Sequence, residues 1–121
     1  MIVSGIVYGQ PQRKDNSRRL IKNRSTGKPM IIKSAKAFSY VESFIRQVPK
    51  PLRVNIDTPI AVTLTMYYQS NRSDLSAELI YDCLQKAGVI KNDRQIVEAH
   101  HYKRIDKANP RVCWAVKEIE D

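Results

Sequence analysis

Four acidic residues between positions 74 and 93 are the part of this sequence best suited to chemistry. Asp74, Glu78 and Asp82 follow one another at intervals of four, and Asp93 comes after them in a polar turn. Intervals of four place side chains along one face of a helix. Mg²⁺ is commonly held by one or two carboxylates together with water and phosphate oxygens. The spacing therefore indicates a candidate divalent-metal site.

The same residues also have purely structural explanations. Asp74 suits the first turn of a helix, where it caps backbone N–H groups. Asp82 is placed to pair with Lys86 one turn later, and Glu78 to lie on the solvated face. Asp93 is a residue type common in turns. Spacing alone leaves both interpretations open.

Positive charge is concentrated in the first half of the chain. The 121 residues carry a formal net charge of +9 and a sequence pI near 9.8. Residues 1–53 hold twelve Lys and Arg against Asp15 and Glu42, a balance of +10, whereas residues 54–121 balance at −1. Such an asymmetry favours a polyanionic partner, either a nucleic acid or an anionic membrane surface.

Two groups of basic residues are candidate contacts for phosphates. Residues 12–28 are expected to form a basic loop that contacts a phosphate backbone. The alternative is a solvated loop without a partner. A second group flanks the acidic stretch. The candidates are Arg13, Lys14, Arg18, Arg19, Lys22 and Arg24 in the loop, with Arg72, Lys91 and Arg94 beside the carboxylates.

Several classes of protein lack support in the sequence. There is no run of about 18 apolar residues and no signal-peptide pattern, so we expect no membrane association and a cytoplasmic location. Cys83 and Cys113 stand alone in apolar surroundings, which predicts buried free thiols. The sequence contains no GxGxxG, Walker loop, paired CxxC or GxSxG motif.

The elements that would position these residues follow from local patterns. Residues 2–8 are predicted as a strand, and 20–22 are expected to pair with 29–33 across a turn at 26–28. Ser34 is a suitable N-cap for a helix that runs to about Val48. The predicted buried face of that helix carries Phe38, Val41, Phe44, Ile45 and Val48.

The second half contains a strand, a helix and two further strands. Residues 59–68 alternate as a half-buried strand does. Ser73 or Asp74 is expected to cap a helix to about Ala87, with Leu75 on its apolar face and Gly88 at its C-terminal end. Residues 96–105 and 111–119 are predicted to form a hairpin over 95–120. The adjacent His100 and His101 would point to opposite faces of a strand and so could not bind one metal together.

These elements predict a single domain over residues 1–121 with an α+β fold and two main helices. A domain of this size has a modest core, so association of subunits would help it bury more surface.

The stretch DLSAELIYDCLQKAGVIKNDRQIV resembles the RusA family of Holliday-junction resolvases, in the branch carried by phages and prophages. That family has an Asp-rich helix start (DxDNLxK…DAL), then an Ala-Gly-apolar segment and a D-D-x-Q-V turn. The corresponding residues here are Asp82-Cys83-Leu84, Ala87-Gly88-Val89 and Asn92-Asp93-Arg94-Gln95-Ile96. The resemblance is strong over 74–97 and weaker elsewhere.

The resemblance implies a small homodimer with a mixed sheet that cuts two strands of a four-way junction symmetrically. Its cofactor would be Mg²⁺, with Mn²⁺ as an alternative. The partner would be branched DNA, in the cytoplasm of a bacterial or phage-infected cell. The activity would serve DNA recombination and repair.

Carrying the family's site over residue by residue leaves gaps. Three Asp hold the metal in the family, and a Lys on the same helix supports catalysis. Asp74 and Asp93 match two of the Asp positions. Without a gap, the remaining acidic position falls on Arg72 and the Lys position on Glu78; with a two-residue deletion, Asp74 takes the first acidic position and Ser76 the second. Glu78 or Asp82 would then have to replace the missing Asp, and we expect Asp74, Glu78 and Asp93 to be the catalytic and metal-binding residues.

Overall fold

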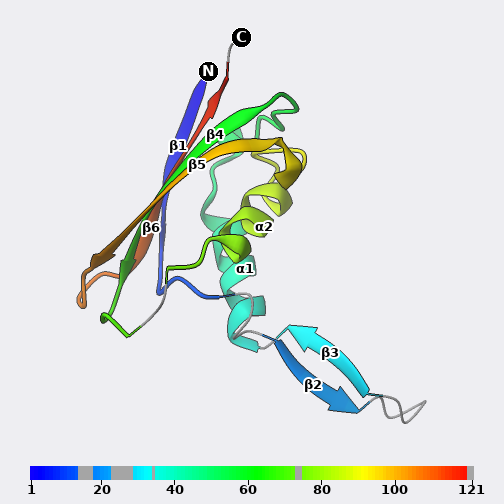
Figure 1. Cartoon of the computed structure of the whole chain (residues 1–121), viewed down its shortest axis with the longest axis vertical. Helices are drawn as coiled ribbons and strands as arrows, with labels where there is room; N and C mark the ends of the chain where they lie inside the picture. The colour runs from blue at the N-terminus through cyan, green and yellow to red at the C-terminus, as the bar shows by residue number, and fades with distance from the viewer. Residues whose placement is uncertain (14–17, 23–28, 34, 73–74, 120–121) are drawn as a thin grey trace.

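The structure is a computed structural model that describes residues 1–13, 18–22, 29–33, 35–72 and 75–119. Its elements occur in the predicted order, which confirms the α+β class with two main helices (Figure 1). The strands are β1 (Ile2–Tyr8), β2 (Arg18–Lys22), β3 (Pro29–Lys33), β4 (Ile60–Tyr68), β5 (Ile96–Ile105) and β6 (Arg111–Glu118). The helices are α1 (Ala35–Gln47) and α2 (Glu78–Lys86), with short 3₁₀ turns η2 (Lys50–Leu52) and η3 (Asp93–Gln95).

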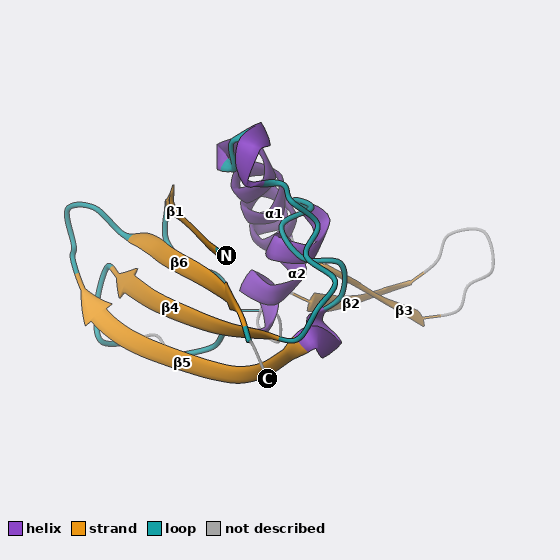
Figure 2. Ribbon diagram, turned by 90° about the horizontal axis from the view of Figure 1, so that it is seen from above, coloured by secondary structure: helices purple, strands orange, loops and turns teal. Residues whose placement is uncertain are grey.

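Four of these strands form one mixed sheet in the order β1-β6-β4-β5. β4 runs parallel to β5 and antiparallel to β6, and β6 runs antiparallel to β1. Both α-helices lie on one face of this sheet, so the other face carries no helix (Figure 2). The sheet therefore has one covered face, one open face and two edges, which are β1 and β5.

The alternation predicted for residues 59–68 is confirmed in β4, the strand that positions the core. Every second residue of β4 is buried beneath the helices, and the residues between them lie half-buried on the open face. The buried set is Ile60, Val62, Leu64, Met66 and Tyr68. Successive side chains of a strand point to opposite faces, so this pattern specifies which face receives α1 and α2.

The predicted hairpin over 95–120 is wrong, although both of its strands exist. β5 and β6 each pair with β4, which lies between them. The turn after β5 passes the end of β4, where the Asp106 backbone N–H donates to the Tyr68 carbonyl oxygen at 2.8 Å. β5 follows β4 through α2, and a parallel neighbour reached through a helix lets that helix bury its apolar face on the sheet.

The helix predicted after Ser34 is confirmed as α1, but its buried face is rotated from the predicted one. Phe38 is 58% exposed, whereas Ala37 and Tyr40 are buried together with Val41 and Phe44. The rings of Tyr40 and Phe44 meet edge to face with centroids 6.2 Å apart. Tyr40, one turn before Phe44, provides the aromatic contact that the apolar pattern assigned to Phe38.

The second helix begins later than predicted. α2 starts at Glu78, and Leu75 is outside the helix and 39% exposed rather than part of its apolar face. A helix advances about 1.5 Å per residue, against about 3.3 Å for a strand. The return path along the nine-residue β4 therefore needs extended chain as well as helix. Gly88 ends α2 with a φ of +81°, as predicted.

The predicted pairing of 20–22 with 29–33 is also confirmed. β2 and β3 form an antiparallel ribbon in which Arg18 faces Lys33 and Lys22 faces Pro29. This ribbon makes a sheet of its own and extends away from the four-stranded sheet, beyond the start of α1 (Figures 1 and 2). The turn expected at 26–28 lies outside the described residues.

Candidate functional site

Asp93 lies in a turn that the surrounding chain holds firmly. The Asn92 side chain accepts from the Arg94 backbone N–H at 2.9 Å, and the Gln95 side chain accepts from the Asn92 backbone N–H at 2.6 Å. These two bonds form a reciprocal cap at the start of η3. Gln95 also donates to the Ile56 carbonyl oxygen at 2.7 Å. The turn is therefore fixed by its neighbours, and the Asp93 side chain is left exposed.

Glu78 lies at the other end of α2 from Asp93. The Asp93 backbone N–H donates to the Gln85 side chain at 3.2 Å, which places Asp93 beside the last turn of the helix. Glu78 is the first helical residue, and the seven steps from residue 78 to residue 85 correspond to a rise of about 10 Å. The structure therefore does not bring Glu78 and Asp93 together.

Asp74 lies outside the described residues. Because 75–77 are not helical, the predicted single helix face through Asp74, Glu78 and Asp82 is wrong; only Glu78 and Asp82 share α2. In the described part of the chain, no three His, Cys, Asp or Glu side chains gather as metal ligands would. A Mg²⁺ site at Asp93 would therefore rest on one or two carboxylates with water and phosphate oxygens, not on a cluster of three described side chains.

The sequence did not indicate the contact between α2 and β5 that Tyr81 and His101 make. Their side chains share a hydrogen bond between the Tyr81 hydroxyl and His101 Nε2, with ring centroids 5.7 Å apart. Burial raises the pKa of the Tyr81 phenol and lowers the pKa of His101, which the neighbouring His100 lowers further. The phenol thus keeps its proton and donates to a neutral imidazole.

The two histidines point to opposite faces, as predicted. His101 meets α2, whereas His100 lies on the open face with its Nε2 atom 3.5 Å from a Glu98 carboxylate oxygen. Alternation alone could show that the faces differ, but not which of the two faces a helix would cover.

Basic residues surround both the acidic turn and the loop before α2. Lys91 and Arg94 are exposed on either side of Asp93, and Arg72 is exposed in the loop after β4. Lys103 reaches this loop from β5, and its Nζ atom donates to the Asn71 carbonyl oxygen at 3.3 Å. Spacing in the sequence offered no signal for Lys103, because it is 32 residues away from Asn71.

The basic residues of 12–28 fall into three groups. Arg18, Arg19 and Lys22 belong to β2, and Arg13 is half-buried at the end of the segment that follows β1. Lys14 and Arg24 lie outside the described residues. A two-stranded ribbon has the width that the major groove of B-DNA admits. The β2–β3 ribbon is thus a candidate nucleic-acid contact.

Neither cysteine forms a disulfide. Cys83 is buried as predicted, whereas Cys113 is only half-buried because it faces the open side of the sheet. No helix among the described residues is long and apolar enough to span a membrane.

Together these features define an α+β chain with a mixed four-stranded sheet, a basic β-ribbon and a hydrogen-bonded turn at residues 91–95, called the acidic turn here because it exposes Asp93. No protein-family model matches the chain. It is similar to the crossover junction endodeoxyribonuclease RusA of Aquifex aeolicus (strain VF5), with 34% identity over 68 residues. The match covers 54% of this chain and 54% of the relative, so the chain spans about half the length of the curated relative it matches.

Proposed function

We propose that this protein binds branched DNA, four-way junctions above all, and hydrolyses phosphodiester bonds in it with a divalent cation, in the manner of a crossover junction endodeoxyribonuclease. The observation that carries the proposal is the similarity to the Aquifex aeolicus protein, which bears that name. The basic ribbon and the charged turn around Asp93 supply the physical support.

The β2–β3 ribbon and the residues around Asp93 would bind the DNA. Arg18, Arg19 and Lys22 on β2 would follow the phosphate backbone together with Arg13, Lys14 and Arg24. Lys91 and Arg94 would hold the phosphates next to Asp93, and Arg72 those next to the loop before α2. Each such contact releases counterions from DNA, so affinity should fall steeply as salt rises.

The proposed cation ligands are Asp93 and Asp74. Asp93 precedes β5, and Arg72, two residues before Asp74, follows β4 at the other end of this parallel pair, so one cation would have to take the two carboxylates from different subunits. Bound Mg²⁺ or Mn²⁺ would offset charge on the scissile phosphate and lower the pKa of a water molecule. Carboxylate oxygens suit such hard cations. Because hydrogen bonds already fix the acidic turn, its backbone at Asp93 would lose little conformational entropy when the cation binds. Glu78, proposed from the sequence as the third carboxylate, would have to act from the far end of α2.

A homodimer is part of the same proposal. A four-way junction is nearly two-fold symmetric, and a C2 pair of subunits would present two equivalent sites to it. The expected setting remains the cytoplasm of a bacterial or phage-infected cell.

A second candidate function is binding of junction DNA without cleavage. The observation that favours it is that Glu78 and Asp93 lie at opposite ends of α2, so the described residues include no group of three metal ligands. The acidic residues of α2 would then be only the solvated side of that helix.

Cleavage of a labelled four-way junction in Mg²⁺ separates the two functions. We expect the wild-type chain to cut, EDTA to abolish cutting, and Asp93→Asn to lower the cleavage rate by about a hundredfold or more while junction binding persists. Glu42→Gln, which removes an exposed carboxylate on α1, is the matched control and should cut like wild type. A wild-type chain that binds junctions but never cuts them would establish the second function instead.

A further inference from the structure

The open face of the sheet carries a row of alternating tyrosine and arginine side chains. Strand pairing aligns one residue from each strand: Tyr8 on β1, Arg111 on β6, Tyr67 on β4 and Arg104 on β5. Residues paired across neighbouring strands project from the same face, and the odd-numbered residues of β4 are those that face away from the helices. At a strand spacing of about 4.8 Å, this Tyr–Arg row crosses the whole sheet over about 14 Å.

Contacts within the row hold its central arginine in place. The Arg111 guanidinium carbon lies 3.8 Å from the centroid of the Tyr67 ring. Arg111 Nη1 also donates to the Asp106 carboxylate at 2.8 Å and to the Asn109 carbonyl oxygen at 2.9 Å. A guanidinium fixed in this way loses little freedom when a further planar group stacks on it or a phosphate binds it.

Two tyrosine rings beside this arginine are exposed to solvent. Tyr8 is 54% exposed and Tyr102, aligned with Thr65 in the next row, is 44% exposed. The Arg104 guanidinium carbon lies 5.6 Å from the centroid of the Tyr102 ring. Exposed aromatic rings interleaved with arginines are the arrangement on which unpaired nucleic-acid bases stack.

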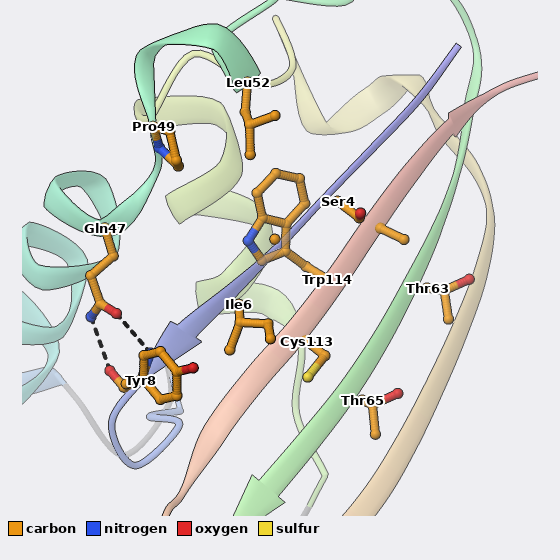
Figure 3. Close-up of a pocket in the computed structure, with 12 residues that line it drawn as sticks. Ser4, Ile6, Tyr8, Gln47, Pro49, Leu52, Thr63, Thr65, Cys113 and Trp114 are labelled. Atoms are coloured by element: carbon orange, nitrogen blue, oxygen red, sulfur yellow. Dashed lines mark hydrogen bonds between the residues drawn. The ribbon is translucent and has the colours of Figure 1, made fainter.

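Small side chains cover the sheet next to the Tyr–Arg row. Ser4, Cys113, Thr63 and Thr65 lie side by side on β1, β6 and β4 (Figure 3). A hollow of about 670 Å³ continues over this part of the face. The short side chains leave room above the strands for a base and its sugar, and the threonine hydroxyls can form hydrogen bonds with base edges.

Charge at this end of the sheet favours an anionic occupant. Arg104, Lys107 and Arg111 stand against Asp106, so the balance is 3 − 1 = +2, and Glu98 lies at the opposite end of β5. An apolar partner would remove these arginines from water without replacing their hydrogen bonds. A single strand offers both phosphates and free base faces, whereas a duplex hides the faces of its bases.

We propose that the open face of the sheet binds single-stranded nucleic acid. Two or three unpaired bases would stack on Tyr8, Tyr102 and the Arg111 guanidinium, as bases do on other four-stranded sheets, with Arg104 and Lys107 on the adjacent phosphates. This site lies on the side of the sheet opposite the helices, away from the acidic turn. It requires no cation and no cleavage, so it stands or falls separately from the proposed nuclease activity.

Fluorescence anisotropy of a labelled oligothymidylate of about 12 nucleotides, with the full chain in EDTA, tests the stacking. The double variant Tyr8→Leu, Tyr102→Leu should bind about tenfold or more weakly than wild type, with an unchanged salt slope because no charge is lost. The double variant with Phe at both positions keeps the rings and should bind like wild type.

Phe38→Leu, which removes an exposed ring from α1 on the other side of the sheet, is the matched control and should also bind like wild type. Equal affinity of wild type and the Leu double variant, with circular dichroism showing a folded chain, would refute the proposal.

An abasic strand of the same length separates bases from phosphates. Wild type should bind this strand about tenfold or more weakly than oligothymidylate, and the Leu double variant should bind it as wild type does. Equal binding of both strands by wild type would show that phosphate contacts alone hold the DNA, and the stacking site would be excluded.

Alkylation of Cys113 locates the bound strand on the protein. Cys113 is half-buried on the open face next to the Tyr–Arg row, whereas Cys83 is buried in the core. Oligothymidylate should slow the reaction of Cys113 with iodoacetamide several-fold. Protection that needs no DNA and rises with protein concentration would show that a second copy covers the face, and an unchanged rate with bound DNA would place the strand elsewhere; either result would overturn the proposal.

Discussion

Gly5 shows how one residue can decide the packing of a core aromatic. Trp114 is 2% exposed because its ring covers the backbone of β1 at the position without a side chain. Three Trp114 ring atoms would lie within 3.0 Å of a Cβ atom there, too close for ordinary contact. The close approach of ring and backbone, rather than backbone flexibility, is what requires glycine.

Gly5→Ala should therefore destabilise the fold. We expect a loss of about 1–3 kcal/mol in the free energy of unfolding, because Trp114 or β1 must shift to make room. Urea denaturation followed by tryptophan fluorescence would measure it. Ser4→Ala, on the next residue and the open face, is the control and should change stability little. An unchanged midpoint for Gly5→Ala would mean that the indole moves at no cost.

The Tyr81–His101 pair makes stability depend on pH in a specific direction. The pKa of His101 is lowered in the folded chain, so the unfolded chain binds the proton more readily than the folded chain does. The contribution of this pair is present above about pH 6.5 and is lost as pH falls below it. Protonation would also remove the acceptor that the Tyr81 hydroxyl uses.

We expect the loss of thermal stability between about pH 7.5 and pH 5 to be smaller in His101→Asn than in wild type. His100→Asn removes only the second cause of the lowered His101 pKa, so it should reduce the pH dependence less than His101→Asn does. Melting curves at both pH values would measure the difference. Equal pH dependence in wild type and His101→Asn would show that His101 does not couple folding to protonation.

At the scale of elements, the β2–β3 ribbon can be tested separately from the acidic turn. Its bonds are internal to a two-stranded sheet, and it extends away from the main sheet (Figure 1). Changes to its charges should therefore alter binding more than folding.

Replacing Arg18, Arg19, Lys22 and Arg24 with Gln should weaken junction binding at low salt. If all four contact phosphates, the slope of log affinity against log salt should fall by about 3 to 4. Arg46, Lys50, Lys86 and Lys107, all exposed outside the ribbon, provide a control with the same loss of charge. Fluorescence anisotropy over a salt series would compare the two. Equal slopes in the two variants would remove the ribbon from the DNA interface.

Over the whole molecule, the central position of β4 organises everything else. β4 pairs with both β5 and β6, and its buried residues underlie both helices. The acidic turn lies at the start of β5 and the loop with Arg72 at the end of β4. Because β4 and β5 are parallel, these two sites lie at opposite ends of the same pair of strands. The parallel pairing of β4 and β5 therefore determines how far the charged residues around Asp93 lie from those around Arg72.

Local sequence patterns determined much of this protein. Neighbours within a few residues predict the alternation of residues 59–68, the pairing of 20–22 with 29–33, the end of α2 at Gly88 and the opposite orientation of the two histidines. Hydrogen bonding and steric limits act at that range, so the sequence alone was sufficient for these features.

Only the tertiary structure decided which surfaces meet. β4 lies between the two strands that were predicted to form a hairpin. Tyr40 rather than Phe38 is buried in the core. α2 begins at Glu78, which places Glu78 at the far end of the helix from Asp93. The tertiary structure also joined Tyr81 to His101 and left β1 with an open edge. The physical reason is that a pattern shows which face of an element is apolar, whereas burial against a particular partner depends on how all the elements share one core.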